Sequence, residues 1–495
     1  MLRLPCFVLI TALFAAPVAA AAQDAPKYSV AFDAQKKELA VKLCLAHAHP
    51  RVAFAADSKW GMRFILDARR GNGRTLETGD GEWMADDWRA GECLSYRADL
   101  AAITAQHDSD VGMRLGEDLV SAPQLWLLRP DVQGEANAEL HIVLPAGWSI
   151  SAPWHEQPSQ DPKRASAAGN LSFSIPNTPA NWSAAVAIGQ FEEERIALPG
   201  GVLRLTILHG ADAEQRTKLH DWLARVSRAV LSAYGRLPLG DVQVLMLPVS
   251  NLGLAQRAVA AFAARPVHFG QSIRGEGNAL ELLVDPARPA QEFDADWVAV
   301  HELSHLMHPY LGDRGSWLAE GLATYYQNIL RARSGLLTPV QAWDRMRGSL
   351  TDAAATPYHD TLEEAARNMH RTHGFDRVYW SGAVYWLTVD RDLRRASGGK
   401  LSVEVALSRF RDCCLPSHRE WSPQDFVARL DALLEVNTFS ARYREFSDMR
   451  QFPDWEKLYT DLGIRSEGGR IVFVADAIDA DARDKIMTMP AAGTR

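Results

Sequence analysis

The sequence predicts a multidomain α+β protein, with a β-sandwich first, a mixed sheet with helices in the middle and a mainly helical C-terminal region. Three observations predict this order. Short segments that alternate apolar and polar residues fill the stretch from Tyr28 to about Leu198. A Pro-Gly-Gly turn follows at residues 199–201, and helical periodicity dominates from Ala213 onward. We therefore expect four parts, namely residues 1–22, 23–199, 200–400 and 401–495.

Residues 1–22 have the organisation of a signal peptide. Arg3 supplies the positive charge, an apolar stretch covers Leu4–Val18, and small residues at Ala19–Ala22 offer cleavage sites. The stretch is too short to span a membrane, and no later stretch approaches about 18 apolar residues in a row. We therefore expect export to the periplasm or the medium, without a membrane span.

The first domain, residues 23–199, is expected to form the β-sandwich. Turns such as RGNGR and PAGW separate its strand-like segments. These segments are YSVAFDA, ELAVKLCLA, MRFILDA, LSYRADLAA, AELHIVL, LSFSI and AAVAIGQF. We interpret the tryptophans of this region as packing residues rather than as a platform for carbohydrate.

Four cysteines follow the predicted signal peptide. Cys44 and Cys93 lie in two strand-like segments, and an exported protein can oxidise them. We predict a Cys44–Cys93 disulfide between neighbouring strands, with two buried thiols as the alternative. Cys413 and Cys414 are adjacent, and the sequence leaves their state open. None of the four has the spacing of a zinc finger.

The composition fits a folded protein that does not bind nucleic acid. Of the 495 residues, 47% are hydrophobic and 23% are charged. The formal net charge is -8 at pH 7, and the chain contains no basic run.

The middle region alternates strands and helices. Strands are expected at residues 201–210, 241–249 and 279–286, and helices from Ala213 and at residues 256–264. This pattern predicts a mixed sheet that precedes the segment carrying the candidate site.

That segment contains His301, Glu302 and His305 in the pattern H-E-x-x-H. We expect a helix that is capped by Asp294 or Asp296 and ends before Pro309. Residues four apart share one face of a helix. The two imidazoles can therefore hold one zinc ion, while the carboxylate takes a proton from a water that the metal acidifies. The alternative is a chance occurrence of a short motif.

A second helix supplies a third candidate ligand. Ser316 can cap a helix over Trp317–Arg333, which ends near Gly335. Glu320 lies in its first turns, and a catalytic zinc site needs a third protein ligand in addition to two histidines. The alternative is that Glu320 only stabilises the helix N-terminus as an acidic residue.

The two helices together resemble the gluzincin metallopeptidases. H-E-x-x-H followed by WLAEGLATYY is most similar to the glycyl aminopeptidase family, relatives of aminopeptidase N and leukotriene hydrolase. The similarity continues through ARSGLLTPVQAW and VYWSGAVYWLTVDRDLRRASGGKLSVEVAL and covers roughly residues 237–462. It implies a thermolysin-like catalytic domain at residues 200–400.

The resemblance also implies roles for single residues. It implies that His301, His305 and Glu320 bind one zinc ion and that Glu302 is the general base and acid. In the family, a tyrosine three residues before a glycine stabilises the oxyanion, and Tyr379 stands in that position here. The alternative for Tyr379 is an ordinary packed aromatic residue.

Substrate binding is expected just upstream of the zinc helix. In the related fold an edge strand holds the substrate backbone, and we assign that strand to Asn278–Val284. Exopeptidases of the group hold the free amine with a glutamate, and Glu276 in the segment RGEGN is the nearest match. The departure from the usual pattern leaves a surface turn as the alternative. It also leaves aminopeptidase against endopeptidase open.

The C-terminal part is expected to be mainly helical. Thr338 and Pro339 begin one helix well, and the helix that carries Tyr379 ends at Gly398. A final strand is expected in IVFVADAI, followed by a disordered tail.

These observations predict an exported zinc metallopeptidase that acts on peptides, with an aminopeptidase as the first choice. A zinc endopeptidase of the same fold and an inactive peptide-binding relative are the alternatives, and hydrolysis of a substrate other than a peptide is a further one. The side-chain preference, the physiological substrate and the oligomeric state stay open.

Overall fold

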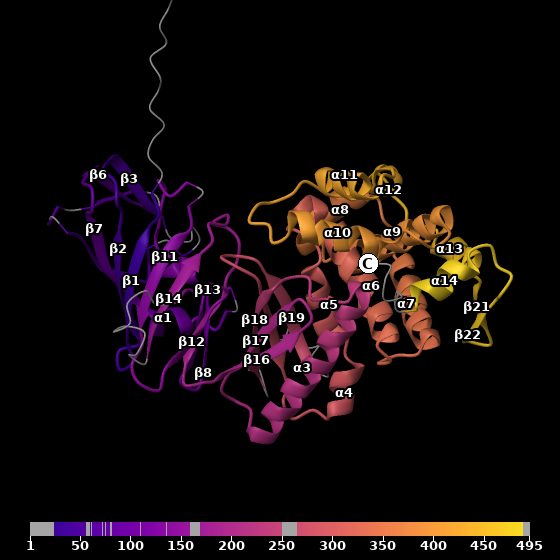
Figure 1. The fold of residues 1–495 in the computed structure, drawn as a ribbon, viewed down its shortest axis with the longest axis horizontal. Coiled ribbons are helices and arrows are strands. Elements are labelled where there is room, and N and C mark those ends of the chain that lie inside the picture. The colour runs from indigo at the N-terminus through magenta and orange to yellow at the C-terminus, as the bar shows by residue number, and fades with distance from the viewer. Residues whose placement is uncertain are drawn as a thin grey trace, which may run out of the picture.

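The computed structural model describes residues 24–488 except 56–59, 61, 72, 75, 80–81, 109, 135, 159–168 and 250–264. The predicted signal peptide, the helix expected at 256–264 and most of the predicted tail lie outside the described residues. Figure 1 shows a β-rich part at the N-terminal end, a sheet flanked by helices in the middle and helices at the other end. This order agrees with the predicted multidomain α+β class.

The N-terminal β-region, residues 24–189, consists of three sheets around one core. Its elements are β1 (Lys27–Asp33), β2 (Glu38–Cys44), β3 (His49–Ala55), β4 (Ile65–Arg70), β5 (Glu77–Thr78), β6 (Glu82–Trp88), β7 (Cys93–Asp99), α1 (Leu100–Thr104), β8 (Gly112–Leu115), β9 (Asp118–Ser121), β10 (Arg129–Pro130), β11 (Ala138–Val143), β12 (Ser149–Ser151), β13 (His155–Glu156), β14 (Asn170–Ile175) and β15 (Val186–Gly189). The strand orders are β13-β14-β11-β1-β2-β7-β4, β10-β3-β6-β5 and β12-β15-β9-β8. Alternate residues of β1 are buried, as the sequence pattern predicts. Trp88, Trp126 and Trp154 are among the largest buried side chains, which agrees with a packing role.

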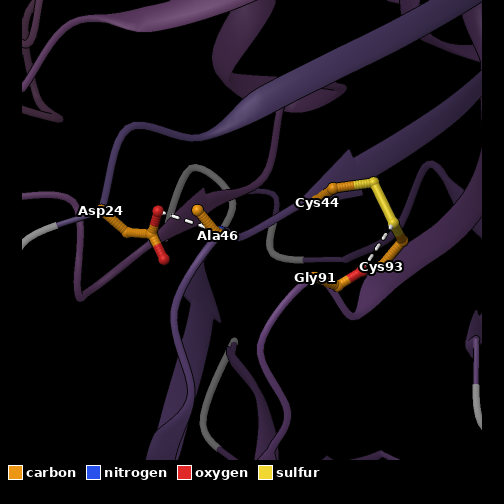
Figure 2. The surroundings of a disulfide bond; sticks show 5 residues. All are labelled: Asp24, Cys44, Ala46, Gly91 and Cys93. Atoms are coloured by element: carbon orange, nitrogen blue, oxygen red, sulfur yellow. Dashed lines mark hydrogen bonds between the residues drawn. A yellow bond between two sulfur atoms is a disulfide. The ribbon is translucent and has the colours of Figure 1, made fainter.

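Cys44 and Cys93 are joined by a disulfide, the pair that the sequence predicted. They stand opposite each other on the paired strands β2 and β7, with their Cα atoms 4.1 Å apart. Figure 2 shows the Asp24 carboxylate beside Ala46, two residues after Cys44, where it accepts from the Ala46 amide at 3.0 Å. Asp24 thus binds the segment that directly follows β2. Cys413 and Cys414, whose state the sequence left open, also form a disulfide.

The five-stranded sheet that follows the N-terminal β-region begins before residue 199, the predicted end of the first domain. The strand β16 (Glu193–Leu198) pairs with β17 (Gly201–Ile207) rather than with the N-terminal β-region. Pro199 and Gly200 therefore form the turn of a hairpin, with Gly200 at a φ of 84°. Pro199, Gly200 and Gly201 do mark a turn, but a hairpin turn and an interdomain linker use the same residue types, so the sequence does not distinguish them.

This five-stranded sheet has the order β16-β17-β18-β20-β19. It is completed by β18 (Asp241–Pro248), β19 (Val267–Ile273) and β20 (Ala279–Val284). The helix α3 (Ala213–Tyr234) begins at the predicted residue. Asp212 and Gln215 form a capping box at its start, and Gly235 ends it in the left-handed conformation.

The predicted substrate strand, Asn278–Val284, is not the edge of this sheet. β20 pairs with β18 on one side and with β19 on the other, so it is an interior strand. Among the described residues, β19 forms the edge on this side of the sheet and β16 forms the opposite edge. Every residue of β20 is buried, which matches its nearly continuous apolar sequence. The edge assignment is therefore corrected to Val267–Ile273.

One face of the five-stranded sheet packs on the N-terminal β-region and buries a carboxyl group there. Ala279 and Leu283 of β20 join an apolar cluster with Val120 and Ala187. Glu281 lies between them on the same strand and is 1% exposed. Burial raises the pKa of the Glu281 carboxyl from 4.5 to about 8.

Glu281→Gln is expected to stabilise the protein at alkaline pH. At low pH the Glu281 carboxyl is protonated in both the folded and the unfolded protein. As the pH rises from 4.5 to about 8, it ionises in the unfolded protein but stays protonated in the folded one, so the free energy of unfolding decreases. At pH 8.5 the free energy of unfolding of the variant should exceed that of the wild type by a few kcal/mol, so the variant should unfold at a higher temperature. Near pH 4.5 the two proteins should be equally stable. Thermal unfolding across this range measures the effect, with the exposed Glu192→Gln as control. An equal benefit at both pH values would contradict the buried-acid explanation.

The remaining chain is mainly helical. Its elements are α4 (Ala290–Ala295), α5 (Val298–His305), α6 (Ser316–Arg333), α7 (Pro339–Ala354), α8 (Leu362–Thr372), α9 (Phe375–Ser397), α10 (Val403–Cys414), α11 (Pro423–Leu434), α12 (Thr438–Ser447), α13 (Trp455–Asp461), β21 (Ile464–Glu467), β22 (Arg470–Phe473) and α14 (Ala480–Ile486). Thr338 caps α7 in front of Pro339, and the strand expected in IVFVADAI is β22 of a small hairpin. Within the part of the chain that is described, no helix has the length and apolarity to cross a membrane.

Candidate metal centre

The helix α5 carries the H-E-x-x-H motif in the interior of the protein. All of its residues are buried, because one face packs on the apolar core and the other meets α6 and β19. The N-cap residue is Trp297, which makes no side-chain cap bond, so the predicted caps Asp294 and Asp296 are wrong. Asp296 stands one position earlier and accepts from the Val298 amide at 2.8 Å. The helix ends at His305 instead of His308, and the last residues before Pro309 form a turn.

The three predicted metal ligands converge on one point. An oxygen of Glu320 on α6 lies 3.2 Å from Nε2 of His301 and 3.5 Å from Nε2 of His305. One possible ligand atom each of His301, Glu302 and His305 also lies within 4.8 Å of the others. Two imidazoles and a carboxylate with this spacing are the donor set of a catalytic zinc site.

Hydrogen bonds on the far side of each imidazole leave the converging nitrogens free for a metal. Nδ1 of His301 donates to the side-chain oxygen of Gln327 at 2.9 Å. Nδ1 of His308 lies 2.7 Å from the Pro309 carbonyl oxygen and must donate to it, so Nε2 of His308 accepts from Nδ1 of His305 at 3.1 Å. Both ligand histidines therefore use Nδ1 for the outer hydrogen bond and turn Nε2 inward, where a neutral ring can coordinate a metal, and the residues fit a zinc ion.

These outer partners were missed in the sequence, although each stands at a helical interval from a ligand. Gln327 follows Glu320 by seven residues, which places both on one face of α6. His308 follows His305 by three residues in the turn that ends α5. Polar residues at such intervals from a ligand are the signal that could have found them.

The two carboxylates of the site differ in their electrostatics. Burial raises the pKa of Glu302. Burial acts on Glu320 too, but the imidazoles of His305 and His301 outweigh it and hold the pKa of Glu320 well below its usual range. Glu320 is thus suited to remain an ionised ligand, and Glu302 to exchange a proton.

Tyr379 on α9 contacts the metal site through His301 and Glu320. Its ring stacks on His301, with ring centroids 5.9 Å apart and 18° between the planes. Burial, together with the charges of Glu320 and Glu302, raises the pKa of the Tyr379 hydroxyl, which is hydrogen-bonded to Glu320. The hydroxyl therefore keeps its proton and is available as a donor.

A pair of glycines allows this approach of α9 to α6. A Cβ atom on Gly321 would lie 2.5 Å from the Cα atom of Gly382, and a Cβ atom on Gly382 would lie 1.9 Å from the Trp317 carbonyl oxygen. Glycine has no Cβ, so the two backbones can touch. Because Gly321 follows Glu320 directly, and Gly382 follows Tyr379 by three residues, the contact sets the distance between ligand and tyrosine.

The structure does not bring Glu276 and Asn278 to the metal site. The Glu276 carboxylate is 2% exposed and accepts from Arg129 at 2.7 Å and from Trp154 at 2.9 Å. The Asn278 carbonyl accepts from the Gln243 amide of β18 at 3.1 Å. The prediction of Glu276 as an amine anchor is corrected accordingly, because both of its oxygens are engaged by the N-terminal β-region.

Comparison with known proteins agrees with this geometry. Residues 299–383, from α5 to α9, match the model of the M61 glycyl aminopeptidase family. A search of curated proteins gave no match. The family match thus covers both metal helices and Tyr379, but a minority of the chain.

The fold is shared with solved structures at low identity. An aminopeptidase N family protein from Idiomarina loihiensis superimposes with a TM-score of 0.66 at 15% identity, over 89% of this chain and 79% of that one. A mutant M1 zinc metallopeptidase from Deinococcus radiodurans, bound to a Tyr-Ser-Ala substrate, gives 0.52 at 15% identity, over 87% of this chain and 95% of that one. The matched segment and the shared fold confirm the recognition of a gluzincin zinc metallopeptidase resembling the glycyl aminopeptidase family.

Proposed function

We propose that the protein is an exported aminopeptidase that binds one zinc ion through His301, His305 and Glu320. The observation that carries the proposal is the convergence of these ligands from α5 and α6, with the Tyr379 hydroxyl against the same carboxylate. Export rests on the sequence of residues 1–22.

The residues of the site divide the hydrolysis between them. Zinc, when bound, would acidify a water molecule and polarise the scissile carbonyl. Glu302 accepts the proton of the attacking water and then gives it to the leaving amine nitrogen, which its raised pKa favours. Tyr379 donates a hydrogen bond to the carbonyl oxygen as negative charge develops there.

Tyr379→Phe is expected to lower kcat by roughly 100- to 1,000-fold, because it removes a donor to the developing oxyanion. The ring and its stacking on His301 remain, so zinc content and thermal stability should stay close to those of the wild type. Steady-state kinetics with a metal analysis measure both. The control is Phe375→Leu, which changes an aromatic side chain that packs against Tyr379 but removes no hydroxyl group. A wild-type kcat in Tyr379→Phe would exclude the oxyanion role.

An endopeptidase is the second candidate, and a specific observation favours it. Glu276 is held by Arg129 and Trp154. The predicted amine anchor is therefore engaged away from the metal site, whereas an endopeptidase needs no carboxylate to select a free amine.

Hydrolysis of matched substrates tests the proposal. The mature protein is compared on aminoacyl amides with a free amine, on the same amides with an acetylated amine, and on longer peptides blocked at both ends. Faster cleavage of the free-amine amides, lost on chelation and restored by zinc, is expected. Cleavage of the blocked peptides alone would establish the endopeptidase. A protein that binds no zinc would overturn both candidates.

A further inference from the structure

The turn between β19 and β20 is inserted into the N-terminal β-region. At its centre the Glu276 amide donates to the Thr178 hydroxyl at 2.9 Å, and its carboxylate accepts from Arg129 and Trp154. Arg129 also donates to the Thr178 carbonyl at 2.6 Å. Glu276 has a φ of 58°, a conformation that a residue with a side chain rarely adopts, so these contacts determine the backbone there.

The glycines beside Glu276 show how close this insertion is. A Cβ atom on Gly275 would lie 2.3 Å from the Ser183 carbonyl oxygen, and one on Gly277 would lie 2.1 Å from the Pro153 carbonyl oxygen. The Gly275 amide donates to that Ser183 oxygen at 2.8 Å. The segment R-G-E-G-N thus fits between backbone segments of the N-terminal β-region, and no side chain could replace either glycine without movement.

The strand that leads into this turn is bound to the zinc helix. The Ser272 hydroxyl donates to the Glu302 carbonyl at 2.6 Å, and the Arg274 guanidinium donates to the carbonyls of His305 and His308. A Cβ atom on Gly270 would lie 2.9 Å from Cγ of Glu302. Gly270 and Ser272 of β19, and Arg274 directly after it, therefore face α5, since alternate side chains of a strand share one face.

β19 is also the strand that can bind the substrate backbone. Among the described residues it pairs with β20 on one side only, so its other edge can pair with an extended peptide. A strand in this position must be placed accurately with respect to Glu302, because catalysis depends on the geometry of substrate, base and metal.

We propose that Glu276, Arg129 and Trp154 form a latch through which the N-terminal β-region positions the substrate strand β19 against the zinc helix. Glu276 is a positioning residue in this arrangement. It fixes the turn from one side, while Ser272 and Arg274 fix the strand to α5 from the other. The proposal deepens the peptidase function proposed above and rests on it for its kinetic consequences.

Two variants test the latch in the full-length mature protein. Glu276→Gln replaces the acceptor of the Trp154 N–H with a neutral amide, and Trp154→Phe removes the donor but keeps an aromatic ring. Both should retain zinc and lower kcat/KM by roughly 10- to 100-fold, a loss expected when reacting groups are displaced slightly. The loss should be equal for free-amine and acetylated substrates, because the strand binds the backbone of either. The exposed Glu139→Gln, which breaks an ion pair with Lys27 in the same region, is the control.

Hydrogen exchange separates the latch from the peptidase proposal. The amides of Ser272 and Arg274 should exchange faster in Glu276→Gln and in Trp154→Phe than in the wild type, whether or not the protein cleaves peptides. Wild-type exchange in β19 together with unchanged kcat/KM would overturn the latch. A loss confined to free-amine substrates and to Glu276→Gln would also overturn it, because that pattern belongs to an amine anchor. If Glu276→Gln does not fold, Trp154→Phe carries the same comparison.

Discussion

Glu302→Gln is expected to retain zinc and to lose at least about 1,000-fold in kcat, within the range reported for general acid–base catalysis. The side chain is nearly isosteric, and the metal contacts come from His301, His305 and Glu320. Glutamine can neither accept the proton of the attacking water nor return one to the leaving amine. Metal analysis and steady-state kinetics on the purified mature protein measure the two properties.

The control for this variant is Glu292→Gln on α4, which removes an acid outside the metal cluster. It should keep the wild-type kcat. Loss of zinc from Glu302→Gln would show that Glu302 is itself a ligand, and an unchanged kcat would remove it from the mechanism. Either result would require a different base for the same site.

Gly382→Ala is expected to destabilise the protein and to reduce activity together. Its new Cβ atom would lie 1.9 Å from the Trp317 carbonyl oxygen and 2.7 Å from Cα of Gly321, and both are backbone atoms that cannot rotate away. The helices α6 and α9 must separate, at about 1–3 kcal/mol or more. Tyr379 lies one helical turn away, so its hydroxyl should move from Glu320 and kcat should fall.

Gly348→Ala on α7 is a matched control for the chemistry of the substitution. Apart from its chain neighbours and the backbone of its own helix, no described atom lies within 4 Å of the Cβ position there. Alanine is favoured over glycine in a helix by about 1 kcal/mol, so this variant should be slightly more stable and fully active. Denaturant unfolding and kcat for both variants decide the matter. Equal stability of the two alanine variants would show that α6 and α9 do not depend on the glycine contact.

The features that the sequence predicted well depend on nearby residues. The H-E-x-x-H helix, the cap at Thr338 and the start of α3 at Ala213 are each determined within a few positions of the chain. Tyr379 was reached through the resemblance, because its partner Glu320 lies 59 residues earlier and no local pattern connects them. The role of the glycine pair Gly321 and Gly382 also depends on how α6 and α9 pack together, so the sequence alone does not reveal it.

The predictions that failed concern pairing between distant segments. The apolar sequence of β20 allowed either an edge or an interior strand, and only the antiparallel addition of β19 decided the matter. Glu276 stands close to the expected position of an amine anchor, but Arg129, 147 residues away, engages its carboxylate. A charge pair across such a separation leaves no trace in local composition.

The hairpin of β16 and β17 determines where the chain can be divided. A fragment that starts at residue 200 would lack β16 and would leave β17 as an open edge, with unpaired amides and carbonyls that invite aggregation. A cut within residues 190–192 would keep the sheet whole but still remove Arg129 and Trp154 from Glu276. No cut near this boundary therefore preserves both the five-stranded sheet and the contacts of Glu276. A chimaera that takes the N-terminal β-region from a relative would also need the residues that contact it on the turn between β19 and β20.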